Sequence, residues 1–273
     1  MPIPSFNNEW IVDGSCWGKP RIQVLEIRDR EHPEGEPIAW LLVERQETYR
    51  RETPNGLAYE ASIRLNYELV VEKYSIHKAA KGNFAGRYSL FPEPGGEVSL
   101  SQGGTFLDLP GLTGQRIGTY LMNEIVTWAK RWPEASVNSV ELMIGQGGDE
   151  NKERRNHFWE RFGLEFDYSD PEHRTGRSKP MLAKDLNQVE EWGKNITELR
   201  VQDYLSEVLY TRQKALWEVA RLNSAFNDKR AELRKAEASP IRWALRELYY
   251  QYGGIMAGGA LLAAFASVLW MRF

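Results

Sequence analysis

The sequence predicts an α/β protein, more narrowly an α+β one, in which a β-rich N-terminal part is followed by long helices and a single C-terminal transmembrane helix. Three observations predict this order. Apolar and polar residues alternate over 63–71, as in a half-buried strand. Apolar residues recur at helical spacing over 114–131 and again over 186–238. No charged residue occurs over 248–271.

Composition and charge narrow the classes of function. A chain of 273 residues with 42% hydrophobic residues can bury a substantial core. Its formal charge of −3 gives no reason to expect nucleic acid as a partner. The single Cys16 excludes an internal disulfide, and the four histidines show no ligand spacing, so we expect no metal site. The N-terminal residues lack the basic and apolar pattern of a secretory signal.

The N-terminal part of the chain is predicted to form a series of strands. Each candidate is a short stretch rich in apolar and β-branched residues, bounded by glycine, proline or polar turn signals. The expected strands cover 21–27, 37–43, 63–71, 86–91 and 97–109.

The stretch 107–122 joins a short apolar strand to a helix through a loop that contains Gly111 and Gly114. Backbone N–H groups in the first turn of a helix have no acceptor within the helix and lie at the positive end of its dipole. A strand, a glycine loop and a helix therefore form an anion site without any charged side chain. We expect a phosphate group to bind here.

After this loop, helices and strands alternate. Helical spacing predicts helices over 114–131 and 152–162, the second ending at Gly163, and an apolar run predicts a strand over 137–144. A strand, a helix and a second strand in this order imply a crossover connection with strands that are at least locally parallel.

Two of these segments resemble a known family. The run Pro110-Gly-Leu-Thr-Gly-Gln-Arg-Ile-Gly-Thr-Tyr-Leu121 and the later Phe158-Trp-Glu-Arg-Phe-Gly-Leu-Glu-Phe166 resemble the acetyl-CoA-binding loop and the FYxxxGF helix of the GCN5-related N-acetyltransferases (GNAT). The resemblance covers 96–168 and implies a GNAT-like mixed sheet, with 1–184 as the acetyltransferase domain.

The resemblance implies that acetyl-CoA is the acyl donor and that an amine, such as a protein lysine or N-terminus, is the acceptor. In the family, the backbone amides of the loop hold the pyrophosphate, and the preceding strand lines the pantetheine arm and the thioester. Carried over by position, the coenzyme-binding residues are Leu107, Asp108, Leu109, Thr113, Gly114, Gln115, Arg116, Ile117, Gly118, Thr119 and, displaced by one position, Asn151.

Several positions depart from the family. Thr113 stands where the family has Gln or Arg, and Arg116 stands where it usually has the first glycine. Trp159 replaces the tyrosine that often protonates the leaving thiolate, and an indole N–H is not a useful acid near neutral pH. We take Tyr168 as a substitute acid, although it could instead be a packing residue. We take Glu141 as the base, although it could instead be a solvated charge on the face of a strand.

The segment 185–238 is predicted to be an amphipathic helical stalk. Its proline-free sequence spaces apolar residues three or four apart. Arg212, Asn223 and Arg230 interrupt the apolar seam, so a coiled coil that forms a homodimer and a helix packed back on the globular domain both remain open.

The segment 239–273 is predicted to be a membrane-proximal helix and a tail anchor. Its uncharged run over 248–271 approaches the ~20 residues that span a bilayer, with a buried core helix as the alternative. Gly254 and Gly258 form a GxxxG pair that could support a dimer. Basic residues precede the run in excess, which predicts a cytoplasmic N-terminal part.

These expectations leave two functions open. The first is a membrane-anchored N-acetyltransferase. The second is a membrane-tethered scaffold or regulatory protein whose GNAT-like fold binds acyl-CoA but turns it over weakly or not at all.

Overall fold

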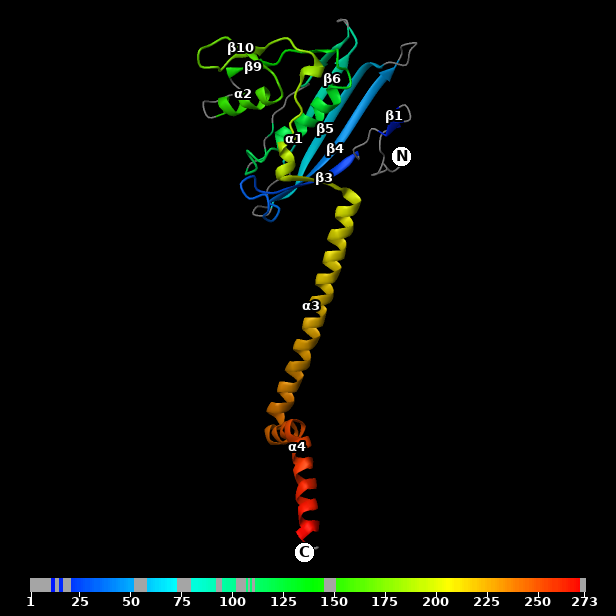
Figure 1. The fold of residues 1–273 in the computed structure, drawn as a ribbon, viewed down its shortest axis with the longest axis vertical. Coiled ribbons are helices and arrows are strands. Elements are labelled where there is room, and N and C mark those ends of the chain that lie inside the picture. The colour runs from blue at the N-terminus through cyan, green and yellow to red at the C-terminus, as the bar shows by residue number, and fades with distance from the viewer. Residues whose placement is uncertain are drawn as a thin grey trace. The chain divides into compact units, whose positions relative to one another are not determined.

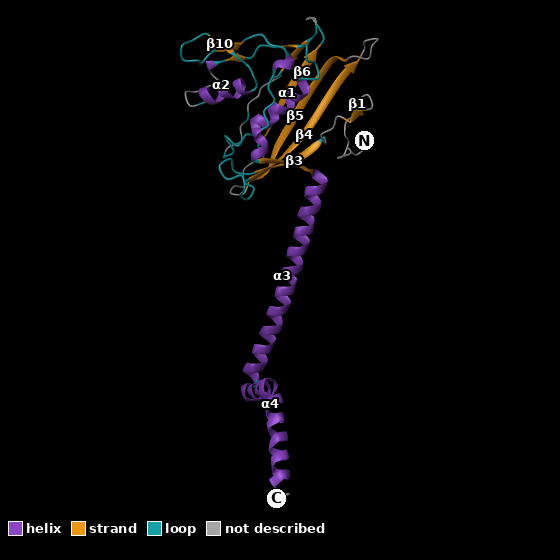
Figure 2. Cartoon of the chain, viewed as in Figure 1, coloured by secondary structure: helices purple, strands orange, loops and turns teal. Residues whose placement is uncertain are grey.

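The computed structural model describes residues 11–12, 15–16, 21–51, 58–72, 80–91, 95–101, 107, 109, 111–144 and 151–270. The chain divides into two units, 1–205 and 206–273. Figure 1 shows the order of the elements along the chain, and Figure 2 separates helices from strands. The mixed α/β architecture expected from the sequence is confirmed.

The first unit is built on a seven-stranded sheet. Its strands are antiparallel to their neighbours except for the last pair, β7 and β8, which is parallel. The order across the sheet is β12 (Ile196–Arg200), β3 (Ile22–Ile27), β4 (Ala39–Arg51), β5 (Ala58–Glu72), β6 (Lys81–Ser89), β7 (Glu97–Ser99) and β8 (Ser136–Val137).

Two smaller sheets complete the strands. One contains β10 (Phe166–Tyr168), β11 (Gly176–Ser178) and β9 (Glu141–Leu142), in that order and antiparallel. The other pairs β1 (Ile11–Val12) with β2 (Ser15–Cys16).

Helix α1 (Ile117–Ala129) lies on one face of the main sheet (Figure 1). All of its residues except Gly118 and Thr127 are buried, because the helix packs on the sheet and is covered on its other sides. The helix approaches β6 closely: a Cβ atom on Gly86 would lie 2.9 Å from Cγ2 of Ile125. Glycine at this position therefore permits the packing that forms the core. Helix α2 (Lys152–Arg161) buries Asn156 and Trp159.

A charged network lies between α1 and the sheet. Arg45 on β4 contacts Glu47 at 2.6 Å and Glu124 on α1 at 2.5 Å. Arg131 contacts Glu47 at 2.7 Å, and the Tyr49 hydroxyl donates to Glu47. Each charge has an opposite partner, which offsets the cost of removing it from water.

The strand predictions differ from the structure mainly in length. Strands β4 and β5 are longer than expected, because they form a long pair along their length. Among the described residues of the strand expected over 97–109, the pairing is confined to β7. The strand expected over 137–144 is divided between β8 and β9, which belong to different sheets.

The structure also differs from the expected start of the helical stalk at residue 185. Short 3₁₀ turns cover Ala183–Asp185 and Glu191–Lys194, strand β12 follows, and α3 (Val201–Ala238) begins only afterwards. The apolar spacing around Ile196 resembles a helix, but pairing with β3 makes this segment an edge strand. The sheet therefore extends beyond residue 184.

The second unit contains the remainder of α3 and α4 (Pro240–Trp270). Ser239 separates the two helices, and its carbonyl accepts from the Trp243 N–H at 3.0 Å. No residue of α3 is buried. Among the residues that the structure describes, no helix combines the length and apolarity needed to cross a membrane. The transmembrane helix expected over 248–271 is thus unsupported here.

Candidate functional site

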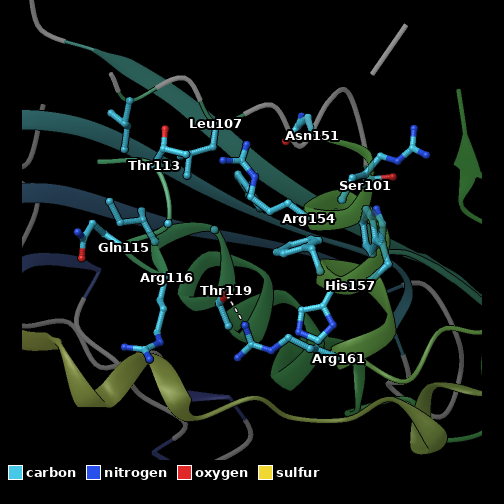
Figure 3. A pocket seen from close by; sticks show the side chains of 18 of the residues that line it. Ser101, Leu107, Thr113, Gln115, Arg116, Thr119, Asn151, Arg154, His157 and Arg161 are labelled. Atoms are coloured by element: carbon cyan, nitrogen blue, oxygen red, sulfur yellow. Dashed lines mark hydrogen bonds between the residues drawn. The ribbon is translucent and has the colours of Figure 1, made fainter. Parts of the chain in front are cut away.

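The first unit contains a cleft of about 1130 Å³. Its walls come from the glycine loop and the start of α1, from the chain between β8 and β9, and from α2, with Arg30 and Phe84 added from elsewhere. Figure 3 labels some of these side chains, with Arg154, Leu107 and Thr113 on one side and Thr119 and Arg161 on another.

The cleft lies where β7 and β8 separate. These strands pair at only two positions, Glu97 with Ser136 and Val98 with Val137, and the Asn138 N–H donates to the Val98 carbonyl at 2.7 Å. Farther along, Ser101 and Ser139 both line the cleft. A parallel pair that separates in this way leaves room for a narrow ligand between two backbones.

The first turn of α1 forms one end of the cleft. The N–H groups of 117–119 have no acceptor within the helix, and they lie at its positive end. Gly114 (φ 85°) and Arg116 (φ 61°) both adopt the left-handed conformation, which turns the chain into the helix. Arg116 is unusual here because non-glycine residues rarely take this conformation. This is the arrangement on which the prediction of an anion site depends.

A buried asparagine, Asn195, holds this loop in place. Its Nδ2 donates to the carbonyls of Arg28 at 3.0 Å and Gln115 at 3.2 Å, and its Oδ1 accepts from Nη1 of Arg116 at 2.9 Å. Gln115 in turn accepts from the backbone N–H of Arg30 at 2.7 Å through its Oε1. The loop is therefore anchored to segments far from it in sequence.

The same end of the cleft is rich in arginine. Arg161 on α2 contacts Glu191 at 2.8 Å and donates to Thr119 at 3.4 Å. Burial lowers the pKa of Arg116, and the nearby charges of Arg30 and Arg161 lower it further, while Glu191 opposes them. Arg30 and Arg161 are therefore close enough to Arg116 for their charges to act on it.

Most of the predicted coenzyme-binding residues lie together in the cleft. Those that line it are Leu107, Leu109, Thr113, Gly114, Gln115, Arg116, Ile117, Gly118, Thr119 and Asn151. Asp108 lies outside the described residues.

The two predicted catalytic residues are placed differently. Glu141 lines the cleft, and its carboxylate forms an exposed ion pair with Arg177 at 2.7 Å. Tyr168 does not line the cleft: its ring stacks on His173 with centroids 3.9 Å apart, and its hydroxyl donates to Glu160 at 3.2 Å. Burial and Glu160 raise the pKa of Tyr168, which makes the phenol a weaker acid. The structure does not bring these two side chains to one site.

Several lining residues were not predicted from the sequence. They are Arg30, Ser101, Ser139, Arg154, His157, Arg161 and Glu191. Arg161 falls within the 158–166 run, but the resemblance gave it no role, and the others lie outside the quoted motifs because the fold brings them together from separate elements. Trp159, which stands where the family has its tyrosine, is buried and still reaches the wall of the cleft. Within the described ranges, no cluster of His, Cys, Asp or Glu side chains could hold a metal ion.

Comparison with known proteins returns no matching family model, no matching curated protein and no matching solved structure. The geometry of the cleft therefore carries the functional argument.

Proposed function

We propose that this chain binds acetyl-CoA in the cleft and transfers the acetyl group to an amine, as an N-acetyltransferase. The observation that carries the proposal is the path of the cleft, which joins the N-terminal turn of α1 to the space between the separated strands β7 and β8. An anion site at one end and a narrow slot between backbones at the other suit a ligand with a phosphate group and a long, amide-containing arm.

In this proposal, the backbone N–H groups of Gly114 and of 116–119 bind the pyrophosphate, since the N–H of Gln115 already donates to the Leu112 carbonyl at 3.3 Å. The pantetheine arm lies beside Leu107 and Leu109 on one wall and Ser139 and Val140 on the other. The thioester end lies near Phe84, where apolar side chains exclude water. The resemblance of 110–121 to the GNAT loop agrees with this placement.

Transfer requires one proton to leave the amine and one to reach the thiolate. The neutral amine attacks the thioester carbonyl, the tetrahedral intermediate collapses, and the C–S bond breaks. Glu141 is our proposed base, directly or through water, once its carboxylate leaves Arg177. The acid is unassigned, because Tyr168 lies elsewhere and Trp159 has no acidic group.

One observation favours the second function, an acyl-CoA-binding scaffold with weak turnover. Trp159 occupies the place of the family's acid, and among the described lining residues there is no tyrosine. Binding without catalysis would need the loop and the slot but no proton donor.

Calorimetry with acetyl-CoA tests the binding step. A Cβ atom on Gly118 would lie 3.7 Å from Leu107 and Phe158, which is an ordinary contact, so Gly118→Ala should fold as the parent does. Gly118 lines the cleft in the first turn of α1, so the larger side chain of Gly118→Val should weaken binding more than that of Gly118→Ala. No binding by the parent protein would overturn both functions.

Thiol release with a panel of amines then separates the two functions. We expect turnover by the parent protein, and faster turnover by Trp159→Tyr because the phenol restores an acid. Binding with no thiol release by either protein would exclude the enzyme and favour the scaffold.

We also propose that α4 holds the chain at a membrane, with the first unit on the cytoplasmic side. Support comes from the uncharged run over 248–271 and from the basic residues before it.

Self-association is a further proposal. Large apolar side chains of α3 are exposed at three- and four-residue spacing, among them Leu205, Leu209, Leu216, Val219, Phe226 and Leu233. Added Cβ atoms at Gly254 and Gly258 would meet nothing within 4 Å, so another helix could approach there. Sedimentation of the full chain measures its self-association, and the Leu216→Glu variant is the comparison.

A further inference from the structure

Three arginines from three separate elements gather at the α1 end of the cleft, and we call them the arginine cluster: Arg30, Arg116 and Arg161. Arg30 follows β3, and its backbone N–H is bound by Gln115, the residue before Arg116. Arg161 comes from α2 and donates to Thr119 in the first turn of α1. Figure 3 shows Arg116 and Arg161 on either side of Thr119.

The cluster carries more positive charge than its neighbours neutralise. Glu191 pairs with Arg161 at 2.8 Å. Arg116 is held by Asn195, whose amide is neutral. Arg30 contacts Glu31 at 3.7 Å, and both side chains are more than half exposed, so this pair is weak. Bringing like charges together costs free energy unless an anion binds between them.

Two of these arginines are held in place without the anion. Asn195 is 2% exposed and fixes Arg116 together with the loop, while Glu191 and Thr119 orient Arg161. The backbone N–H of Arg30 is held by Gln115, and its exposed side chain can turn toward a ligand. A guanidinium group offers paired N–H donors that match the oxygens of a phosphate. Arg116 and Arg161 are therefore preorganised for a phosphate group next to the amides of α1.

We propose that the arginine cluster binds the 3′-phosphate of the coenzyme, so that the site selects coenzyme A over its 3′-dephosphorylated form. This inference rests on the proposed function and adds a determinant of donor specificity to it. The amides at the start of α1 can hold the pyrophosphate, but the phosphate on the ribose is a separate dianion. It requires a second set of donors, and the arginine cluster lies beside the first.

The test is calorimetry on the full chain with three ligands: coenzyme A, dephospho-coenzyme A and adenosine 3′,5′-bisphosphate. We expect coenzyme A to bind about tenfold more tightly than dephospho-coenzyme A, since charge-assisted bonds to one phosphate are worth roughly this much. The bisphosphate should bind weakly and compete with coenzyme A. Raising the salt concentration should reduce the preference.

Arg30→Gln is the most informative variant, because its side chain is 53% exposed and the backbone bond to Gln115 remains. We expect it to lower affinity for coenzyme A several-fold and to leave affinity for dephospho-coenzyme A unchanged. Arg161→Lys, which keeps the charge but loses the paired donors, should show a smaller loss of the same kind. Arg64→Gln, at an exposed position of β5 that does not line the cleft, is the control and should change neither affinity.

The outcomes separate this inference from the proposed function. Equal affinities of the parent protein for the two coenzymes would overturn the inference and leave the function standing. An Arg30→Gln variant that loses affinity equally for both coenzymes would also overturn it. If neither coenzyme binds, the proposed function fails and this inference fails with it.

Discussion

At the scale of single residues, the conformation of the glycine loop determines how the chain enters α1. Gly114 has a φ of 85°, and a Cβ atom there would meet nothing within 4 Å. Space therefore permits a side chain at this position, and only the backbone conformation disfavours one. Arg116 has a φ of 61°, which is strained for a residue with a side chain, and its hydrogen bond to Asn195 offsets this strain.

This conformation leads to the first prediction. Gly114→Ala should lower the free energy of unfolding by about 1 kcal/mol, because an L-residue with a side chain is strained in the left-handed region. Gly193→Ala is the matched control, since Gly193 is also surrounded by open space but has no positive φ. Urea unfolding of the two variants measures the difference. Equal stabilities would show that the loop conformation costs nothing.

Protonation of a buried carboxylate gives a second prediction. Burial alone would raise the pKa of Glu47, but Arg45, the Tyr49 hydroxyl and Arg131 outweigh it and hold the pKa below its ordinary value of 4.5. Because the pKa of Glu47 is lower in the folded state than in the unfolded state, its carboxylate stabilises the fold at pH values above its ordinary pKa. This contribution is lost as the pH falls through the folded-state pKa. Unfolding measured from pH 7 to pH 3 should show stability falling below about pH 4.5. The stability of Glu47→Gln should fall less steeply as the pH is lowered. If its stability falls as steeply as that of the parent protein, groups other than Glu47 cause the loss.

At the scale of elements, α1 is joined to the sheet by apolar packing and by the charged network. Arg45 and Glu124 have side chains only 10% and 6% exposed. Without the charge of Glu124, the carboxylate of Glu47 would be left as the shared partner of both Arg45 and Arg131, so the buried network would carry an excess positive charge. A surface pair in the same unit, Lys179 and Glu165, is 48% and 77% exposed.

The contrast between these pairs gives a third prediction. Glu124→Gln should destabilise the protein by about 3 kcal/mol, whereas Glu165→Gln should change its stability by less than about 0.5 kcal/mol. Chemical denaturation of both variants tests this. Similar losses would mean that Arg45 finds water or another partner when Glu124 is neutral.

Strand β12 determines where the first unit ends, and this gives a fourth prediction. Residues 196–200 pair with β3, and Asn195 just before them anchors the loop of the cleft. A chain ending at residue 205 should unfold cooperatively and bind acetyl-CoA. A chain ending at 184 should be less stable and lose binding, because it lacks both the strand and the asparagine. If the two chains bind acetyl-CoA equally well, Asn195 is not needed for the site.

At the scale of the whole molecule, the two units have different kinds of surface. The first buries a continuous apolar core, while α3 buries none of its residues. Exposed apolar side chains continue into α4, including Ile255 and Leu262. Such surfaces are typical of helices that meet other helices or lipid.

Membrane attachment is the fifth prediction. The full chain should sediment with membranes and resist extraction by carbonate, because 248–271 carries no charge to keep it in water. A chain that lacks 248–273 should remain in the supernatant. Release of the full chain by carbonate would restrict α4 to a peripheral role.

Local patterns in the sequence are sufficient to predict several of the helices and strands. Alternation over 63–71 predicted β5, where Ile63, Leu65, Tyr67 and Leu69 are buried, and helical spacing predicted α1 and α2. The glycine loop before α1 was recognisable because its residues are contiguous.

The residues that surround that loop are known only from the tertiary structure. It placed Asn195 beneath the loop, gathered the arginine cluster from three elements, made β12 an edge strand and kept Tyr168 out of the cleft. The physical reason is the same in each case. These contacts join residues far apart along the chain, so they leave no periodicity or spacing in the sequence from which they could be predicted.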